Sequence, residues 1–542
     1  MNKRIAVIDA ETDPFCFDRL PQPFLWGFYD GNNYEQFTNT DELIAFLAKQ
    51  DDLIVYAHNG GRFDFHFFSE HINLYEELMI VHGRLAKFKI GECEIRDSWL
   101  ILPIPLGDYK KDEIDYEIFE KEEREKPHNW KKISNYLYGD CIYLYDIITK
   151  FAEQYDLALT MASASMKQWE KISGRKPPRS NAMYYALLKP YYYGGRVECF
   201  RAGEINEEFK LADINSAYPY AMLFKHPIST DYEIKYRVPD NPDVLGPSLV
   251  KVECVSKGAF PYKSETGKLI FPNDSQKREF FVTGWELIAA LKTNTIKMTN
   301  VKEVRIFEET IDFADYINHF YELRLEAKRV QDKANDIYAK LFMNSLYGKF
   351  ASNPDKYRKY LLVPLEFVRE AEADGYSFGG ELGGWAIMER RLDQMEKNFF
   401  NIATSASITG FVRAYLWNAI CQSEGVIYCD TDSIVAKEFG NIPYGDQLGA
   451  WKIELECDYG AVAGKKLYAY HSNEKKAGLY GLHTRKPCKS GAWKIATKGA
   501  RLTPKEVIKV AQGEEIMYYP EVPTYSINRP PRFVTRRLNK TA

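Results

Sequence analysis

The hydrophobic and polar positions of the first hundred residues alternate between the periods of strands and of helices. Residues 4–8 and 53–57 are short apolar runs, which predict two buried strands. Residues 24–37 are interrupted by a turn signal and predict a hairpin. Residues 41–49 have helical periodicity, and a second helix is expected to start near Asp64. Strands and helices that alternate in this way predict an α/β domain.

Further along the chain the pattern is longer and more mixed. Residues 312–349 contain few helix breakers and predict long helical structure, whereas residues 426–435 alternate around an acidic turn and predict another hairpin. Between them, residues 352–398 are rich in Gly, Tyr and charge, which favours a protruding insertion over core. Residues 163–180 are polar and end in Gly-Arg-Lys-Pro-Pro-Arg-Ser, so we interpret them as a domain boundary.

Composition sets only broad limits. The chain has 542 residues, a length that suggests about three or four folding units. Aromatic residues make up 15% of it, and such rings can fill cores or stack on bases, with core packing as the default interpretation. The formal net charge of −4 gives no support for nucleic-acid binding. Basic stretches at residues 175–179 and 529–540 could still bind nucleic acid locally. A solvated linker and a frayed terminus explain these stretches equally well.

Cysteine usage and the first residues of the chain indicate a reducing compartment. The nine cysteines are odd in number and contain no CxxC pair, which argues against a disulfide framework and a zinc ribbon. Residues 1–9 carry an acid where a signal peptide needs apolar residues, and no stretch approaches the ~18 apolar residues that span a bilayer. We therefore expect a soluble cytoplasmic protein with no membrane partner.

A first group of acids follows the predicted N-terminal strands. Asp9 and Glu11 are two apart at the end of a strand, so both point to one face and can hold one divalent ion. About eleven acid-x-acid triplets are expected by chance, so this pair alone indicates little. Asp64 follows the second strand, and Tyr136 and Asp140 are one helical turn apart. Four acids and a tyrosine at element ends suit two-metal phosphodiester hydrolysis, with the phenol positioning a water.

A second group of acids is formed by Asp213 and the hairpin pair Asp430 and Asp432. Acids across a turn and at a strand end can hold two Mg²⁺ ions, which neutralise a triphosphate and activate a 3′-hydroxyl. A hairpin with solvent-facing aspartates is an equally good explanation of the pair alone. Residues 340–348 lie between the two parts and predict a helix, with Lys340 placed to bind triphosphate.

Together these motifs resemble the family B DNA polymerases, and most closely the protein-primed branch of terminal-protein phages and linear plasmids. Each match is weak alone, but their shared order is specific. In chain order the matching segments are residues 9–11, 59–64 and 136–140 (exonuclease motifs), 192–195 (YxGG), 213–219, 340–348 and 428–433 (polymerase motifs A, B and C) and 466–468 (KxY).

The resemblance implies an α/β and α+β multidomain fold, in which a ribonuclease H-like exonuclease domain precedes a right-hand polymerase domain. The expected divisions are residues 1–162 (exonuclease), 163–180 (linker) and 181–542 (palm, fingers and thumb). Within the last, they are residues 225–311 (terminal-protein-contacting insertion), 312–350 (fingers), 351–398 (strand-displacement insertion) and 490–542 (thumb and C-terminal tail).

The resemblance also assigns roles to individual residues. The catalytic set comprises Asp9, Glu11, Asp64, Tyr136 and Asp140 upstream, and Asp213, Asp430 and Asp432 downstream. The metal set is the same acids together with Ile214, with two Mg²⁺ per site and Mn²⁺ as a substitute. The nucleotide-binding set is Tyr218, as steric gate, with Lys328, Lys340, Asn344, Tyr347, Lys466 and Tyr468. The DNA-binding set is His58, Asn59, Phe63, Phe67, Ser98, Tyr192, Gly194, Gly195, Thr431 and Lys498.

By the same resemblance, the chain is expected to be a monomeric, processive, strand-displacing DNA polymerase with 3′→5′ proofreading. Its partners would be primer and template DNA, deoxynucleoside triphosphates and a terminal protein. The family's exonuclease lysine has no clear counterpart, and Lys121 is the candidate. The alternative is a nuclease whose second domain only binds DNA, or a non-catalytic scaffold. The combination of Asp213, Lys340, Asp430 and Asp432 argues against both, because a binding module needs no metal-spaced acids.

Overall fold

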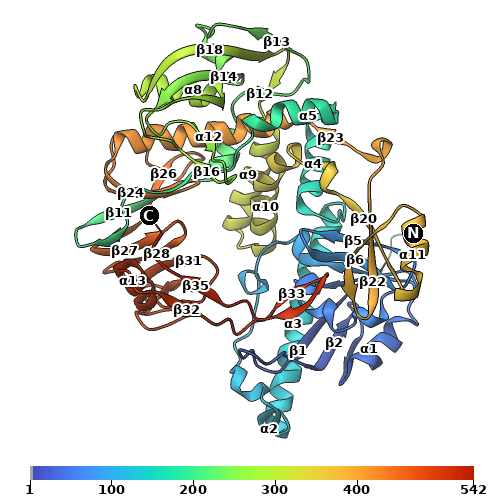
Figure 1. The fold of residues 1–542 in the computed structure, drawn as a ribbon. Coiled ribbons are helices and arrows are strands. Elements are labelled where there is room, and N and C mark those ends of the chain that lie inside the picture. The colour runs from blue at the N-terminus through green and yellow to red at the C-terminus, as the bar shows by residue number, and fades with distance from the viewer. Residues whose placement is uncertain (1–3, 542) are drawn as a thin grey trace.

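A computed structural model describes residues 4–541 of the chain. Figure 1 shows the N-terminal sheet and the C-terminal sheets on opposite sides of a central pair of helices, with a smaller sheet above them. The pair consists of α9 (Ala314–Arg329) and α10 (Lys333–Phe350), which pack along each other. They confirm the helical structure predicted for residues 312–349. In the part of the chain that is described, no helix is both long and apolar enough to cross a bilayer.

A ten-stranded sheet forms the core of the N-terminal side. Its strands β1, β4 and β7 run parallel, and antiparallel strands extend it on both sides. In sheet order the strands are β21 (Ser377–Leu382), β22 (Trp385–Arg391), β20 (Arg358–Val363), β5 (Glu77–Val81), β6 (Arg84–Ile90), β7 (Cys93–Asp97), β4 (Leu53–Ala57), β1 (Arg4–Thr12), β2 (Pro23–Tyr29) and β3 (Tyr34–Phe37). The two predicted strands, the predicted hairpin and the first helix, α1 (Thr40–Leu47), are confirmed.

The helix expected near Asp64 is not an α-helix. After β4 the chain forms two short 3₁₀ turns, Gly60–Arg62 and Asp64–His66, separated by Phe63 with φ −147° and ψ −83°. Close packing requires this tight path, because a Cβ added at Gly61 would lie 2.2 Å from the backbone oxygen of Leu85 on β6. The turn places the Asp64 side chain in the interior, where it is 4% exposed.

The sequence suggested that residues 352–398 protrude freely, but they do not. They fold into β20, β21 and β22, and β20 pairs with β5 at Tyr360 and Leu78, so the segment extends the N-terminal sheet. Leu362 and Ile387 are buried against that sheet. The Gly and charge content hid these short apolar alternations, which only tertiary pairing with β5 makes part of a core.

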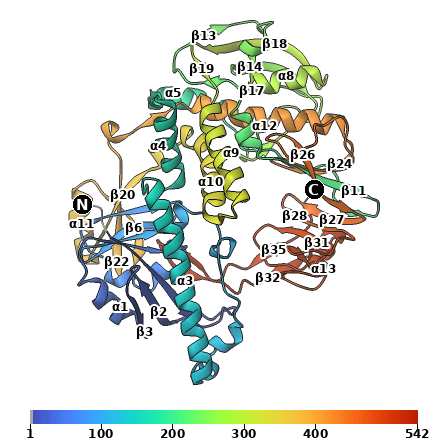
Figure 2. The same cartoon turned by 180° about the vertical axis from the view of Figure 1, so that it is seen from behind.

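Most of the segment expected as a linker is helical. The helix α4 (Met161–Ser173) begins at the N-cap Thr160 and buries Met166 and Trp169 against α9 and α10. Only residues 174–178 lack regular structure before the short strand β8 (Arg179–Ser180). Figure 2 shows α4 beside the upper end of the long helix α3 (Pro127–Gln154), which continues down into the N-terminal side.

A five-stranded antiparallel sheet and the helix α12 (Ile402–Gln422) form the centre of the downstream half. In order its strands are β26 (Trp451–Cys457), β11 (Phe209–Ile214), β25 (Ser433–Glu438), β24 (Glu424–Asp430) and β9 (Val197–Cys199). The hairpin of β24 and β25 confirms the prediction for residues 426–435. Above α12 lies a four-stranded sheet of β13 (Tyr232–Lys235), β18 (Ile296–Phe307), β14 (Leu249–Ser256) and β17 (Lys277–Thr283), with helix α8 (Gly284–Lys292) packed on α12.

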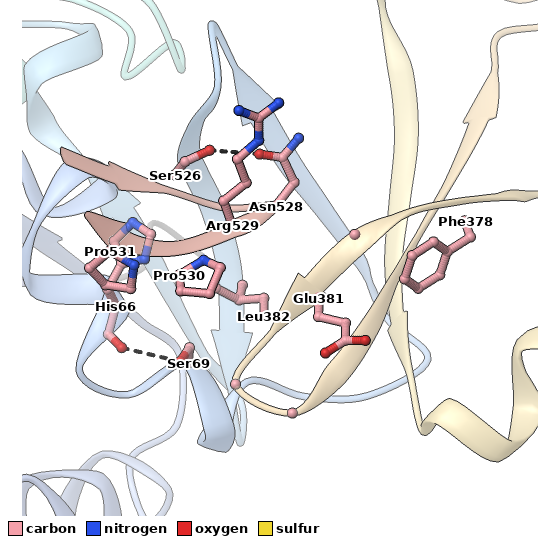
Figure 3. A pocket seen from close by; sticks show the side chains of 13 residues that line it. His66, Ser69, Phe378, Glu381, Leu382, Ser526, Asn528, Arg529, Pro530 and Pro531 are labelled. Atoms are coloured by element: carbon pink, nitrogen blue, oxygen red, sulfur yellow. Dashed lines mark hydrogen bonds between the residues drawn. The ribbon is translucent and has the colours of Figure 1, made fainter. Parts of the chain in front are cut away.

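The C-terminal part is a six-stranded sheet covered by α13 (Pro504–Gln512), followed by a tail that returns to the N-terminal side. The sheet contains β27 (Tyr459–Gly464), β28 (Leu467–His471) and β31 (Trp493–Thr497). The tail forms β33 (Thr524–Ser526) and β34 (Arg529–Arg532), and Figure 1 shows it reaching across to the N-terminal sheet. There it lines a pocket with His66 and with the β21–β22 hairpin, as Figure 3 shows.

Two candidate carboxylate sites

The upstream acids come from three elements, and Glu11, Asp64 and Asp140 are buried while Asp9 is partly exposed. Asp9 and Glu11 lie on β1, Asp64 on the turn after β4, and Asp140 on α3. Burial, with the charges of Asp140 and Asp64, raises the pKa of the Asp9 carboxyl well above its usual value. Burial also raises the pKa of Glu11 well above its usual value and that of Asp64 to about 7. The carboxylates therefore repel one another at close range unless a positive charge is present.

This donor set fits a divalent cation by its chemistry. Hard cations such as Mg²⁺ take carboxylate oxygens, and the buried oxygens Glu11 Oε1 and Asp140 Oδ1 have no hydrogen-bond partner. Within the described residues, no group of three or more His, Cys, Asp or Glu side chains is already close enough to hold an ion. Binding therefore requires the carboxylates to draw together, which a cation would favour by removing their repulsion.

Lys111, and not the candidate Lys121, is the lysine whose charge acts on these acids in the structure. Lys111 Nζ lies 5.6 Å from the ring centre of Tyr136, and its charge lowers the pKa of Asp9, Glu11 and Asp140 against the effect of burial. Lys121 begins the short helix α2 (Lys121–Arg124), is exposed, and makes no ion pair with the four acids among the described residues. Lys111 belongs to an irregular segment, so no periodicity indicated it.

Tyr136 lies where the helical spacing predicted it. Burial, the hydrogen bond with Tyr116 and the charge of Asp140 together raise the pKa of the Tyr136 hydroxyl. The Tyr136 hydroxyl also lies 3.1 Å from the hydroxyl of Tyr116. Tyr136 is thus held between the acids and the solvent-facing loop that carries Tyr116.

The residues predicted to contact a DNA end fall into two groups. His58 is engaged on both ring nitrogens, by Ser98 Oγ at 3.0 Å and by the oxygen of Ile104 at 2.8 Å, and Ser98 is 0% exposed. Both side chains are hydrogen-bonded within the protein in this structure, and their role as DNA ligands stays a prediction. The side-chain oxygen of Asn59 accepts from Arg84 Nη1 at 2.9 Å.

Phe63 and Phe67 form the second group and remain partly exposed. Their rings are 5.1 Å apart, edge to face, and the Tyr525 ring of the C-terminal tail lies 5.5 Å from Phe63. The charge of Asp64 contributes to a raised pKa of Tyr525, whose largest cause is burial. The aromatic wall beside Asp64 therefore includes a residue from the far end of the chain that the sequence did not indicate.

The downstream acids lie at one end of a single sheet, in which β25 separates β11 from β24. Asp213, at the end of β11, pairs with Ser433 of β25, and the amide of Ile214 donates to the Asp432 oxygen at 2.8 Å. Burial and the charge of Asp432 raise the pKa of Asp213 to about 7. Burial also raises the pKa of Asp432 to about 6, with the Asp430 charge contributing. Three oxygen-bearing side chains at one sheet end fit divalent cations by charge and donor type.

The turn between Asp430 and Asp432 is strained and tightly held. Thr431 has φ +59°, a left-handed conformation that is costly for a β-branched residue. Its hydroxyl donates to Asp430 Oδ1 at 3.2 Å, and its amide donates to the Arg196 oxygen at 2.7 Å. The pair is therefore fixed on a rigid turn and is not a free surface hairpin.

Two tyrosines from different elements stack beside these acids. Tyr218, at the start of α6 (Ala217–Ala221), and Tyr347 of α10 have ring centres 4.3 Å apart at an interplanar angle of 7°. Lys340 and Asn344 lie on the same face of α10 as Tyr347 and are exposed, with Asn344 Nδ2 donating to the Lys340 oxygen. Lys328 is exposed on α9. The structure brings together Tyr218 and Tyr347, to which the resemblance assigns neighbouring roles, whereas Lys328 forms no hydrogen bond with them among the described residues.

Lys466 reaches the same acids from the C-terminal sheet. Its Nζ lies 3.6 Å from Asp430 Oδ2, and its amide donates to the Tyr428 hydroxyl at 2.9 Å. The Tyr468 ring packs 5.2 Å from the Tyr428 ring. Lys498 lines one pocket with Lys466 and Asp430, so the predicted lysines converge beside the acidic turn.

The loop of Tyr192, Gly194 and Gly195 packs directly on this turn. A Cβ at Gly195 would lie 2.6 Å from Thr431 Oγ1, which explains why glycine is needed there. Arg413 of α12 donates to the Gly194 oxygen at 2.9 Å and pairs with Glu286 of α8 at 2.8 Å, both side chains being 2% exposed. The sequence analysis missed Arg413, although it is the one charged residue of the apolar segment 402–422.

Comparison with known proteins gives a consistent result. The family model of organellar and viral type B DNA polymerases matches residues 101–377. The DNA-directed DNA polymerase of Enterobacteria phage PRD1 is 32% identical over 575 aligned positions, which cover 99% of this chain and 98% of that protein. The DNA polymerase of Bacillus phage Nf is 24% identical, over 84% of each chain.

Solved structures agree on the fold. The Phi29 DNA polymerase complexed with primer-template DNA and incoming nucleotides superposes with a TM-score of 0.71, covers 100% of both chains and is 18% identical. The binary complex of the same polymerase gives a TM-score of 0.73 over 99% of this chain and 100% of that one. The fold is therefore the multidomain arrangement of that polymerase, as expected. With a relative of 32% identity along its whole length, the chain belongs to the organellar and viral type B DNA polymerases and is a DNA-directed DNA polymerase.

Proposed function

We propose that the two carboxylate sites perform opposite reactions on the same DNA end. The downstream site extends a primer on a template by two-metal phosphoryl transfer, and the upstream site removes mispaired nucleotides as a 3′→5′ exonuclease. The observation that carries the proposal is the placement of Asp213, Asp430 and Asp432 at one end of a single sheet beside the stacked pair Tyr218 and Tyr347.

The downstream residues divide the synthetic reaction between them. Asp213, Asp430 and Asp432 would supply oxygens to two Mg²⁺ ions, whose charge would neutralise the triphosphate and favour loss of the 3′-hydroxyl proton. Ile214 would contribute its backbone oxygen. Lys340 is free to bind the triphosphate of the nucleotide, because its side chain is exposed on α10. The flat Tyr218–Tyr347 stack offers a surface for the nascent base pair, and Tyr218 would exclude a ribose 2′-hydroxyl by its bulk.

The upstream residues suit hydrolysis of a phosphodiester. Asp9, Glu11, Asp64 and Asp140 would hold the ions, and Tyr136 would orient the attacking water from its position beside Asp140. Lys111 is the cation nearest these acids and would stabilise the charge that develops on the phosphate. Phe63 and Phe67 present ring faces and edges on which a frayed base can pack.

The wider function follows from the family. The relatives include phage polymerases, and a protein-primed, processive and strand-displacing enzyme in the cytoplasm of a host cell is the proposal for this chain. The insertion of residues 225–311 would contact the terminal protein, and residues 351–398 would separate strands. The pocket that the β21–β22 hairpin lines with His66 supports the second role, since it places the insertion near the turn that carries Asp64.

Separation of the two activities tests the proposal. Asp430→Ala should abolish nucleotide incorporation on a primed single strand, because one of three clustered acids is lost, while Mg²⁺-dependent degradation of single-stranded DNA persists. Asp64→Ala should do the reverse. Asp446→Ala is the matched control, since Asp446 is exposed with a side chain 91% accessible. If both variants lose both activities equally, the two-site assignment is wrong.

Protein priming has its own test. Incubation with a cognate terminal protein, Mg²⁺ and one labelled deoxynucleotide should yield a covalent protein–nucleotide adduct, and Asp430→Ala should prevent it. Extension that requires an oligonucleotide primer, with no adduct under any template, would assign the chain to nucleic-acid priming.

A further inference from the structure

The turn that carries Asp430 and Asp432 is held by a residue outside the motifs. The Arg196 backbone oxygen accepts from the Thr431 amide at 2.7 Å, and the next residue, Val197, pairs with Asp430 across β9 and β24. Gly195 approaches so closely that a Cβ there would lie 2.6 Å from Thr431 Oγ1. A displacement of the Arg196 backbone would therefore move the turn with it.

The side chain of Arg196 is anchored by residues outside the turn. It is 1% exposed, and its Nε and Nη2 both donate to Glu198 Oε2, at 2.9 and 2.5 Å. Its Nη1 donates to the backbone oxygen of Gly258 at 2.8 Å. Three of its N–H directions are thus occupied by partners at fixed angles, an arrangement that only the planar guanidinium fork provides.

Two aromatic rings hold the guanidinium on its faces. The guanidinium carbon lies 4.1 Å from the ring centre of Phe271 and 4.3 Å from that of Trp417. Trp417 belongs to α12, whereas Phe271 and Gly258 belong to the insertion of residues 225–311. Arg196 therefore joins three parts of the molecule, the catalytic turn, the helix behind it and the insertion.

We propose that Arg196 is a positioning residue of the polymerase site, which sets the place of the turn at residues 430–432 according to the place of the insertion segment at Gly258 and Phe271. This inference rests on the proposed function of Asp430 and Asp432. It adds that the insertion and the acidic turn are mechanically coupled, so that a partner which moves the insertion also changes the alignment of the acids.

The first test is Arg196→Lys, which keeps the charge but loses the fork and the planar stack. Incorporation of a nucleotide on a primed single strand should show kcat reduced by about 10- to 100-fold, because small misplacements of reacting groups have effects of that size. The KM for the nucleotide should change less than about twofold, since Lys340, Tyr218 and Tyr347 are untouched. Degradation of single-stranded DNA at the upstream site should remain at the wild-type rate, which reports that the chain is folded.

The second test is a double-mutant cycle with Phe271→Leu, a change in the insertion. Alone it should lower kcat in the same direction by a smaller factor, and combined with Arg196→Lys it should add nothing. Ile270→Ala is the matched control, because Ile270 is the adjacent residue and is 37% exposed. Amide exchange in a peptide containing Thr431 should accelerate in Arg196→Lys and in Phe271→Leu, and stay unchanged in Ile270→Ala.

The possible outcomes distinguish a failure of the proposed coupling from a failure of the proposed polymerase function. If the wild type incorporates nucleotides without needing Asp430, the proposed function fails. If the wild type depends on Asp430 but Arg196→Lys has wild-type kcat, or the two substitutions act additively, the coupling is wrong. Should Arg196→Lys lose the nuclease activity as well, the exchange of Thr431 and the kcat of Phe271→Leu decide in its place, and wild-type values for both overturn the inference.

Discussion

The two carboxylate sites hold similar acids in different ways. The upstream acids come from a strand, a turn and a helix, and Glu11, Asp64 and Asp140 are at most 7% exposed. The downstream acids lie at one end of a single sheet and remain half-buried. In the proposed functions, hydrolysis of a thin single strand would need only a narrow approach, whereas synthesis would have to admit a base pair and a nucleotide. The difference in enclosure is consistent with the size of what each site is proposed to receive.

The largest effects are expected when one acid of each site is neutralised without changing its volume. Asp213→Asn should lower incorporation by more than about 10³-fold, and Asp140→Asn should do the same to degradation of single-stranded DNA, because each removes a charge from a metal-binding set. Single-turnover assays of both activities on each variant measure the effect. A loss of under tenfold in either case would show that the acid is not part of its set.

Replacing Lys111 tests whether the upstream site depends on the positive charge of this side chain. Lys111→Ala should reduce degradation of single-stranded DNA by about 10²-fold while incorporation is unchanged, because it removes positive charge that favours the ionised acids. Lys121→Ala is the control and should behave as wild type. Equal behaviour of the two variants would remove Lys111 from the site.

The downstream site should depend on the stacked rings of Tyr218 and Tyr347. Tyr347→Ala removes one ring of the stacked pair and should raise the KM for the incoming nucleotide by about tenfold, in line with the value of an aromatic pair. Tyr357→Ala, which changes a tyrosine that is 48% exposed, serves as control. An unchanged KM in steady-state incorporation would show that the stack does not contact the nucleotide.

The smallest expected effect is on the free energy of unfolding at acidic pH, through the buried His226. His226 is 0% exposed, its Nε2 donates to the Ala221 oxygen, its Nδ1 accepts from Ser407, and burial lowers its pKa to about 4. The unfolded chain binds a proton below about pH 6.5 and the folded chain does not, so stability is fully present above that pH. It should fall by about 2 kcal/mol between pH 7 and 5.

Urea denaturation at several pH values measures this change. His226→Asn should be less stable at pH 7 but should lose less stability on acidification, because no proton is taken up at this position. A slope identical to that of the wild type would assign the acid sensitivity to other groups.

Much of the architecture could be predicted because it follows local patterns. The strands at residues 4–8 and 53–57 and the helices around Lys340 have clear periodicity, and their buried residues Ile8, Val55 and Phe342 are 0% exposed. The acids could be predicted because motif order is a property of the sequence. Lys111 and Tyr525 could not, since each reaches its site through an irregular segment whose course depends on tertiary packing.

The two structural predictions that the fold contradicts, for residues 163–173 and 352–398, share one cause. Residues 163–173 and 352–398 have polar compositions, yet each buries a short apolar stripe against a distant element, as Trp169 and Leu362 show. The role of His58 and Ser98 as DNA ligands stays a prediction, but the hydrogen bond between them spans 40 positions and likewise has no sequence signal. Contacts at such separations decide which polar residues are available to a ligand.

The return of the C-terminal tail to the N-terminal sheet affects the order in which the chain can be completed on a ribosome. Phe63 and Phe67 are made early, but Tyr525, which packs on both, is made far later. The aromatic wall of the upstream site is therefore incomplete until Tyr525 has been translated. A chain that stopped before Tyr525 would lack the aromatic cover of this site.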